Sequence, residues 1–437
     1  WMFSLCFLNY LLAMVLLYRG IGTGWPGAAF GSYLIAFGNS RIAQLGHQAL
    51  LSHAFILLAI FSLLMIFGPI AADNHPGETS KLKKRTWIIA LSVIFAAQFY
   101  AGFYTGYFLF LVILIATIWA LCLKRFRQTL LELLRAEWRV VACGLLLAVI
   151  LLLPLAYHYL LIARELGIFS GGKRGLAHWS SYFQMGEENF VYGWMADLSV
   201  FNNRLFDIPM AHEKKWGLGL VTTSILIWFF WRYRHKLWVQ LMLLIVVTTI
   251  VAFTYFPGKL YLWKVWYYTL PGIRGIRVMA RICMLLLIPA GIALAMFVSR
   301  YRAHKGKLVM AIAVALICCL EQAREPRSYD RELYQRRVQT VIQHLNDDCE
   351  AFFLSELYPQ KPQWVSQMDS IWASVLSGVP TITGYSGKFP DNSAIRHPAA
   401  HEPSDLEKID KAIDQWCTEK GIDRGKICWL RLKLPNE

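Results

Sequence analysis

The feature that most constrains the fold is an unbroken apolar run, VVACGLLLAVILLLPLAYHYL, at residues 140–160. A helix of about 20 apolar residues matches the hydrocarbon thickness of a bilayer, so this run predicts a transmembrane helix. Pro154 inside it predicts a kink, because proline removes a backbone donor and clashes with the preceding turn. The composition agrees, since 57% of the 437 residues are hydrophobic and only 16% are charged. A soluble domain carries about 25% charged residues, which excludes an ordinary soluble enzyme.

Nine further apolar segments predict membrane spans in the same way. Together with the first they predict an α-helical polytopic membrane protein with about ten transmembrane helices. No span carries an acidic or basic residue in its interior, which disfavours an ion-coupled transporter. The ten segments are 2–18, 27–43, 50–68, 87–101, 104–123, 140–160, 216–231, 237–256, 282–299 and 308–321.

The charge is distributed unevenly and indicates a domain boundary. Residues 1–322 hold 29 Lys and Arg against 11 Asp and Glu, whereas residues 323–437 hold 15 against 17. We therefore predict a transmembrane domain at 1–322 and a second domain at 323–437. The basic excess belongs to the membrane part, where Lys and Arg flank spans, so we expect no nucleic-acid partner.

The loops between the predicted spans indicate an orientation. One alternating set of loops holds 17 basic residues in short stretches. The other set, 39–50, 161–215 and 257–281, holds 12 in a much longer stretch. Basic loops favour the cytoplasm, so the denser set is predicted to be cytoplasmic. Both termini and the whole C-terminal domain are then expected outside the cytoplasm.

The tail at 323–437 alternates in type and predicts a small α/β domain. Of its cysteines Cys349, Cys417 and Cys428, one pair could form a disulfide if the tail lies in an oxidising compartment, and spacing does not say which. The predicted elements are helices at 330–345, 364–377 and 404–420, and strands at 350–357, 379–383 and 426–432.

The outer loop at 161–215 gathers six of the acidic residues of the membrane part, together with histidines. Carboxylates and imidazoles at a membrane surface could hold a divalent metal such as Mg²⁺ or Mn²⁺, or act as a general base. Glu187, Glu188 and Asp197 are the candidates for catalysis. The alternative is a solvated loop whose charges have no chemical role.

Three arginines follow an aromatic segment at 256–270. Arg274, Arg277 and Arg281 lie three and four residues apart, so on a helix they would share one face. Guanidinium groups suit phosphate oxygens, and these residues lie on the side where basic residues are disfavoured. We expect them to bind a lipid phosphate. The alternative is that they merely extend toward the membrane interface.

Tyrosines supply a further hypothesis. Tyr104 and Tyr107 crowd a predicted outer turn and could line a sugar or lipid groove, or belong to an aromatic belt at the interface. Tyr385 lies in the tail loop GYSGKFPDN (384–392), whose glycines would allow a close approach to a ligand, although a plain turn explains the same residues.

Four segments carry a resemblance to a known superfamily. They are GAAFGSYLIAFGNSRIAQLGHQALLSHAFI (27–56), FYAGFYTGYFLF (99–110), LPGIRGIRVMAR (270–281) and MDSIWASVLSGVPTITGYSGKFP (368–390). In these segments the chain resembles the GT-C glycosyltransferase-like superfamily, and within it the YfhO-like bacterial membrane proteins. The resemblance implies an inner-membrane protein with an outer catalytic face and a C-terminal outer domain.

The resemblance also implies an activity, the transfer of a sugar from a polyprenyl-phosphate-linked donor. Arg274, Arg277 and Arg281 would hold the lipid phosphate, and Tyr385 would face the site. The superfamily places its catalytic carboxylate in the first outer loop, but this chain has no acidic residue before Asp73. Either the base lies upstream of Trp1, or the protein is a non-catalytic subunit or scaffold of a membrane complex. A lipid or solute transporter is the third possibility.

Overall fold

The chain forms two compact units, Trp1–Ala163 with Gly167–Pro326, and Arg164–Leu166 with Arg327–Glu437. We refer to them as unit 1 and unit 2. The sequence had indicated a boundary between 322 and 323. The computed structural model describes residues 2–68, 81–166, 175–196, 210–256, 261–325, 328–346, 348–385, 395 and 399–436.

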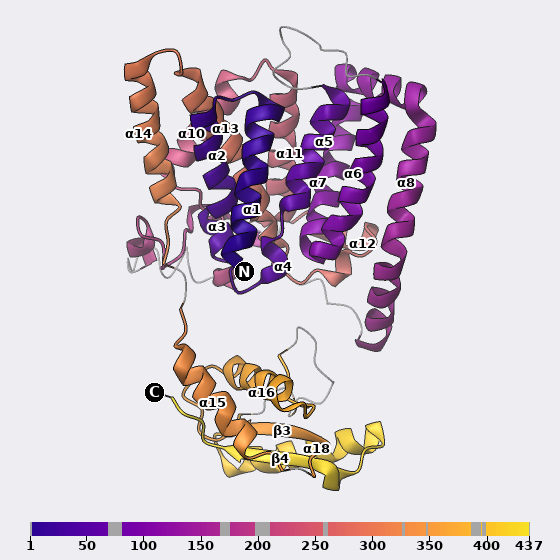
Figure 1. Ribbon diagram of the computed structural model, residues 1–437, viewed down its shortest axis with the longest axis vertical. Coiled ribbons are helices and arrows are strands. Elements are labelled where there is room, and N and C mark those ends of the chain that lie inside the picture. Colours follow the sequence, from indigo (N-terminus) through magenta and orange to yellow (C-terminus); the bar gives the residue numbers. More distant parts are fainter. Residues whose placement is uncertain are drawn as a thin grey trace. The chain divides into compact units, whose positions relative to one another are not determined.

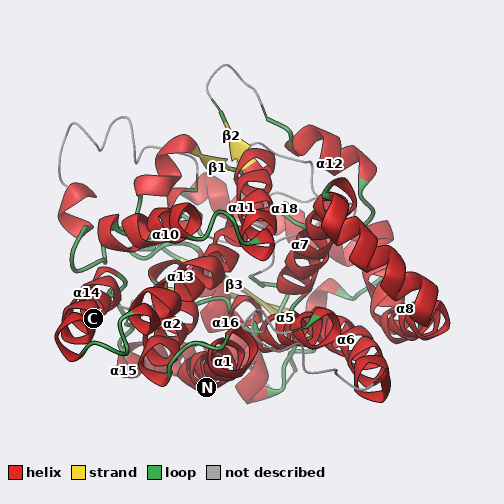
Figure 2. Ribbon diagram, turned by 90° about the horizontal axis from the view of Figure 1, so that it is seen from above, coloured by secondary structure: helices red, strands yellow, loops and turns green. Residues whose placement is uncertain are grey.

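Unit 1 is almost entirely helical, and Figures 1 and 2 show its long helices side by side in one bundle. Its only described strands, β1 (Ala177–His178) and β2 (Thr254–Tyr255), pair in parallel over two residues. Its α-helices are α1 (Met2–Val15), α2 (Trp25–Phe37), α3 (Asn39–Ile42), α4 (Gln48–Leu51), α5 (Ala54–Phe67), α6 (Lys81–Ala101), α7 (Phe103–Cys122), α8 (Lys124–Leu166), α10 (Leu220–Arg232), α11 (Leu237–Phe253), α12 (Trp263–Thr269), α13 (Leu287–Arg300) and α14 (Lys305–Glu321).

Five helical stretches among the described residues are long and apolar enough to cross a membrane. Two more apolar helices, Leu220–Arg232 and Leu237–Phe253, are shorter. The expectation of a helical integral membrane protein is therefore confirmed at this level. The five stretches are Met2–Ile21, Gln48–Phe67, Phe103–Cys122, Lys124–Arg164 and Met279–Arg300.

The centre of unit 1 is the contact between α2 and α13, which pack on each other through glycines. A side chain added at Gly31 would place its Cβ 2.4 Å from the carbonyl oxygen of Gly291. One added at Gly27 would lie 2.3 Å from the carbonyl oxygen of Ala295. Small residues four apart let two helix backbones approach closely, which is how apolar helices associate in a bilayer. The glycines that weaken 27–43 as a helix by propensity are thus the ones that hold it in place.

Helix α8 consists of two helical stretches, the basic one predicted at 124–139 and the apolar one that follows, joined at a kink. The backbone departs from helical angles at Glu137, with φ −129° and ψ 22°, which the sequence did not indicate. Pro154 lies inside the second stretch, and the kink expected there stays a prediction. The buried carboxylate of Glu137 accepts a 2.7 Å hydrogen bond from Nε of Arg85 in α6. This ion pair joins α6 and α8 where the helix changes direction.

Unit 2 has the predicted α/β character. Strands β3 (Ala351–Glu356) and β4 (Ile427–Leu432) pair in parallel, with Ala351 opposite Ile427. The expected strand at 379–383 is reduced to a single bridge between Thr381 and Phe352. The other elements are α15 (Arg331–Gln343), α16 (Trp364–Ser377), α18 (Pro403–Lys420) and the short 3₁₀ helix η10 (Arg424–Lys426).

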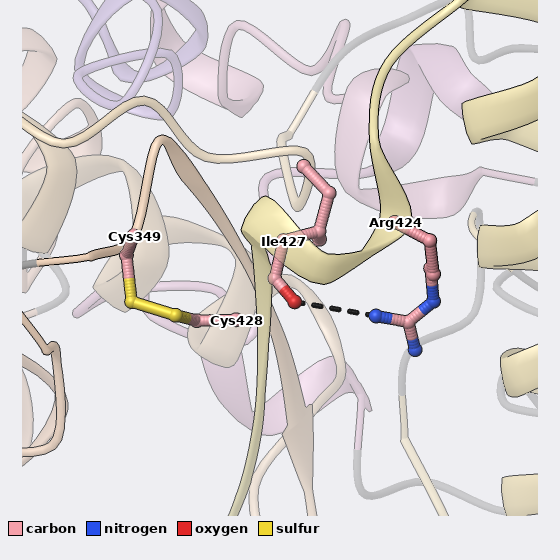
Figure 3. Close-up of a disulfide and its surroundings, with 4 residues drawn as sticks. All are labelled: Cys349, Arg424, Ile427 and Cys428. Atoms are coloured by element: carbon pink, nitrogen blue, oxygen red, sulfur yellow. Dashed lines mark hydrogen bonds between the residues drawn. A yellow bond between two sulfur atoms is a disulfide. The ribbon is translucent and has the colours of Figure 1, made fainter.

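Two features fix the core of unit 2. Cys349 and Cys428 form a disulfide, and Figure 3 shows Arg424 donating a hydrogen bond to the carbonyl oxygen of Ile427 beside it. Arg337 is fully buried and donates to Asp369 at 2.8 Å and to Glu356 at 3.0 Å. The disulfide resolves the cysteine pairing that spacing left open, and Cys417 remains a buried free thiol.

Candidate functional site

Several connecting segments of unit 1 gather at one end of its bundle. Figure 1 shows α3, α4 and α12 at this end, which is the lower one in that view. The 3₁₀ helices η6 (Ala211–Glu213), η8 (Ile273–Gly275) and η9 (Met279–Leu286) contribute the polar side chains. These segments are the loops that the sequence had assigned to one side of the membrane.

A buried ion pair holds these segments together. Arg281 donates from Nε to Oε2 of Glu213 at 2.8 Å and from Nη2 to Oε1 at 2.5 Å. Both side chains are buried, so the forked geometry is needed to offset their desolvation. Burial tends to raise the pKa of Glu213, but the hydrogen bonds and charge of Arg281 lower it below its usual value. Glu213 is therefore ionised, and both of its carboxylate oxygens accept hydrogen bonds from Arg281.

Two rings complete what we call the Arg281 cluster, which consists of Arg281, Glu213, His47 and Tyr104. The guanidinium lies 5.2 Å from the ring centre of Tyr104, a cation–π contact. Nη2 of Arg281 also lies 3.1 Å from Nε2 of His47. Because arginine can only donate, Nε2 must accept and the hydrogen of a neutral imidazole sits on Nδ1. Burial and the charge of Arg281 lower the pKa of His47, which favours this neutral form.

The three arginines do not share a helix face, so that expectation was wrong. Ile276 is extended between η8 and η9, and Val278 is extended as well. Arg274 instead lies over the rings of Tyr267 and Tyr268, at 5.3 and 5.6 Å. Arg277 is exposed, and its backbone N–H donates to the hydroxyl of Tyr104. The glycines of this segment and Pro271 break the helical pattern that the arginine spacing suggested.

Three basic residues of the same connecting segments, Arg274, Arg277 and His212, form what we call the cationic rim, to which His212 adds charge only when it is protonated. The side chain of His212 is 65% exposed and its Nε2 lies 3.9 Å from Oε1 of Glu213. The next residue, Lys214, is buried, and its Nζ has no hydrogen-bond partner among the described residues. Burial lowers the pKa of Lys214 to about 8. Among the described residues here Glu213 is the one carboxylate, and Arg281 neutralises it, so Arg274 and Arg277 leave the described part of the site positive.

Two of the three acidic residues proposed for catalysis, Glu187 and Glu188, lie among the described residues. Glu188 accepts from Lys215 at 2.8 Å and from Arg324 at 2.7 Å. Burial would raise its pKa, but these cations bring it to about 2. Glu187 is exposed. Asp197 lies outside the described residues.

The tyrosines have separate places. Tyr107 is buried and donates from its hydroxyl to the carbonyl oxygen of Pro271 at 2.8 Å, which fixes the turn before η8. Tyr104 is part of the Arg281 cluster. Tyr385 is exposed and belongs to unit 2, so its role beside the site stays a prediction.

Another polar network lies at the end of α14. The buried carboxylate of Glu321 accepts from the backbone N–H groups of Val221 and Thr222, each at 2.8 Å. The hydroxyl of Tyr192 also donates to it, at 2.5 Å. The N–H groups of Val221 and Thr222 belong to the first turn of α10 and have no acceptor within their own helix. Glu321, at the end of α14, therefore caps α10.

Sequence reasoning missed the partners of Arg281. Glu213 is 68 positions away from it and His47 is 234 positions away. Nothing in the local spacing joins them, and the only signal was the concentration of acidic residues in the 161–215 loop.

The described residues contain no group of three or more His, Cys, Asp or Glu side chains that could hold a metal ion. The side chains around Arg281 therefore do not fit the divalent metal that the sequence had suggested. No step of the chemistry below is routed through a metal.

Comparisons with known proteins add no identification. No family model matches the chain, and neither a curated protein nor a solved structure matches it.

Proposed function

We propose that unit 1 is a membrane domain of about ten spans, in which α2, α6, α10, α11 and α14 cross the bilayer alongside the five long apolar stretches. The Arg281 cluster then faces outward, as does unit 2. The density of basic residues in the opposite loops supports this orientation. The disulfide between Cys349 and Cys428 supports an oxidising compartment for unit 2. In a bacterium this corresponds to the periplasmic side of the inner membrane.

We further propose that the cationic rim binds a lipid-linked phosphate. The observation that carries this is the excess of positive charge that the described residues show around Glu213, whose carboxylate Arg281 already neutralises. Arg274 and Arg277 would contact the phosphate oxygens. Arg281 acts as a positioning residue, because its donors to Glu213 fix the segment that carries Arg277. This revises the expectation that all three arginines contact the ligand directly.

The reaction proposed is sugar transfer from a polyprenyl-phosphate-linked donor. The acceptor oxygen forms a bond to the anomeric carbon while the bond from that carbon to the phosphate oxygen breaks. The electron pair of the broken bond stays on the phosphate, where Arg274 and Arg277 stabilise the added charge. A general base takes the acceptor proton, and exposed Glu187 is the candidate among the described residues. The GT-C resemblance is the reason for choosing this reaction.

A non-catalytic role is the alternative, and one observation favours it. Two carboxylates of the outer loop, those of Glu188 and Glu213, are held by cations and are unsuited to accept a proton. A subunit or scaffold of a membrane complex would bind the lipid phosphate without turning it over.

The test is binding of a short polyprenyl phosphate to the purified chain in detergent. Arg274→Gln and Arg277→Gln should together raise Kd at least about tenfold, which corresponds to about 1.4 kcal/mol. Arg300→Gln, which removes an exposed arginine at the end of α13, is the matched control and should leave Kd unchanged. Equal affinity in all variants contradicts the phosphate site. Binding without release of polyprenyl phosphate from a sugar-linked donor, over a panel of acceptors, supports the scaffold instead.

A further inference from the structure

Arg41 is a buried arginine of unit 1 that, unlike Arg281, has no counter-charge among the described residues. Arg41 lies in α3 with no exposed surface. Its Nε, Nη1 and Nη2 have no hydrogen-bond partner among the residues that the structure describes. Elsewhere the fold pairs such groups, since buried Arg281 binds Glu213 and buried Arg337 binds Asp369 and Glu356. Arg41 is thus an exception that needs a physical explanation.

The described surroundings of Arg41 are polar, and none of the groups that they contribute is a carboxylate. Cys6 of α1 and Cys283 of η9 lie within electrostatic range of it, as does the fully buried His53. Asn9 lies one turn along α1 from Cys6, and its Oδ1 has no partner within the described part of the chain. Its amide nitrogen donates to the carbonyl oxygen of Leu51 at 2.8 Å, two residues before His53.

None of these neighbours can neutralise the guanidinium. Arginine cannot lose its proton in a protein, so burial does not remove its charge. A neutral imidazole contributes no negative charge, and an apolar environment disfavours the thiolate form of cysteine. A buried and unpaired charge is strongly unfavourable, and a bound ion of opposite charge removes that penalty.

We propose that Arg41 holds a small monovalent inorganic anion, of the chloride class, in a closed site between α1, α3, the start of α5 and η9. One guanidinium supplies one positive charge, so a monovalent anion balances it and a phosphate dianion would not. Arg41 and His53 have no exposed surface, which excludes a headgroup joined to a lipid tail. The site is separate from the cationic rim, whose Arg277 is exposed, and it does not depend on sugar transfer.

The experiment measures the thermal stability of the purified full chain at constant ionic strength, with gluconate replaced stepwise by chloride or bromide. A ligand that binds only the folded state raises Tm, so we expect a saturable rise of at least about 3 °C. Arg41→Met should abolish this rise. In gluconate the variant should be at least as stable as the wild type, because it lacks the uncompensated charge. Arg277→Gln should keep the full response to chloride.

Other results of these measurements would contradict the proposed anion site. An identical Tm in gluconate and chloride, or a chloride response that survives in Arg41→Met, overturns the proposal. Stabilisation by phosphate but not by halides overturns the choice of a monovalent ion. If Arg41→Met does not fold, anomalous scattering from bromide in crystals of the wild type replaces it. A peak beside the Arg41 guanidinium is then expected, and its absence at saturating bromide refutes the site.

Discussion

The basic side chains of this chain differ in burial, and the difference follows from their partners. Arg281 and Arg337 are buried against carboxylates, whereas Arg277 is exposed beside the cluster that Arg281 organises. Lys214 is buried next to Glu213, yet its Nζ has no partner among the described residues. Burial lowers the pKa of its ammonium group to about 8, and this shift offers a way to observe the burial.

The stability of unit 1 should rise as pH increases from about 8 to about 10. Burial lowers the pKa of Lys214 from 10.5 to about 8, so in this window the unfolded state binds more protons than the folded state. Thermal unfolding in detergent should show Tm rising across the window in the wild type. In Lys214→Met this rise should disappear, whereas Lys215→Met, whose lysine pairs with Glu188, should keep it. An unchanged profile in Lys214→Met would contradict the assignment.

The stability of unit 2 should fall as pH rises from about 4 to about 6. Burial raises the pKa of Asp369 from 3.8 to about 6, although Arg337 opposes this shift. The folded state then binds more protons than the unfolded state in this window, so raising pH favours unfolding. Hydrogen exchange in β3, corrected for its intrinsic pH dependence, should become faster across the window. In Asp369→Asn this change should disappear, whereas an unchanged profile would exclude Asp369 as its source.

At the scale of elements, α2 and α13 approach each other closely through glycines. The Cβ positions of Gly27 and Gly31 are filled by backbone oxygens of α13. Helices in a bilayer gain little from the hydrophobic effect against each other, so close backbone packing carries their association.

Replacing Gly31 by alanine should destabilise unit 1 by about 1–3 kcal/mol, because the added methyl group overlaps the carbonyl oxygen of Gly291 at 2.4 Å. Thermal unfolding in detergent measures this loss. Gly306→Ala in α14 is the control, since a Cβ there meets no atom within 4 Å and should be neutral. Equal melting temperatures for the two variants would contradict the packing described here.

The apolar runs and the tail pattern predicted most elements of the fold. Helix Trp364–Ser377 has the predicted bounds, and β3 and β4 lie within one residue of theirs. The failures have physical causes. The arginines of the 274–281 segment have helical spacing, but Gly272, Gly275 and tertiary contacts of Tyr104 impose turns. The fully buried position of Arg41 near the end of span 27–43 was not foreseen, because burial there depends on α1 and η9.

The site was predicted less well than the fold. The sequence indicated Arg277 and Tyr104, but it missed Glu213, His47 and Lys214. Pairing across 68 and 234 positions leaves no periodic signal in the chain. Such contacts depend on which helices are neighbours in the fold, and local sequence patterns do not specify that arrangement.

At the scale of the whole molecule, the two units have different chemistry. Unit 1 is apolar and mostly helical, whereas unit 2 has a longer parallel strand pair, of six residues in each strand, and a disulfide. The proposed orientation places unit 2 and the Arg281 cluster on the same side of the membrane, with the start of α6 on the other.

Cysteines introduced at exposed lysines should report this orientation. In intact cells a membrane-impermeant maleimide should label Lys411→Cys on α18 and leave Lys83→Cys on α6 unlabelled. The unmodified chain gives the background from its native thiols. Permeabilised cells should label both variants, which checks accessibility, and the reverse pattern in intact cells would invert the topology.

The cap that Glu321 forms on α10 affects how mechanical load enters unit 1. Its carboxylate ties the last turn of α14 to the first turn of α10, and Asn189 donates to the Glu321 carbonyl oxygen at 2.9 Å. Tension on the chain beyond α14 would therefore be shared by two helices rather than fraying one of them. A force applied to the chain after α14 would therefore displace α10 and α14 together.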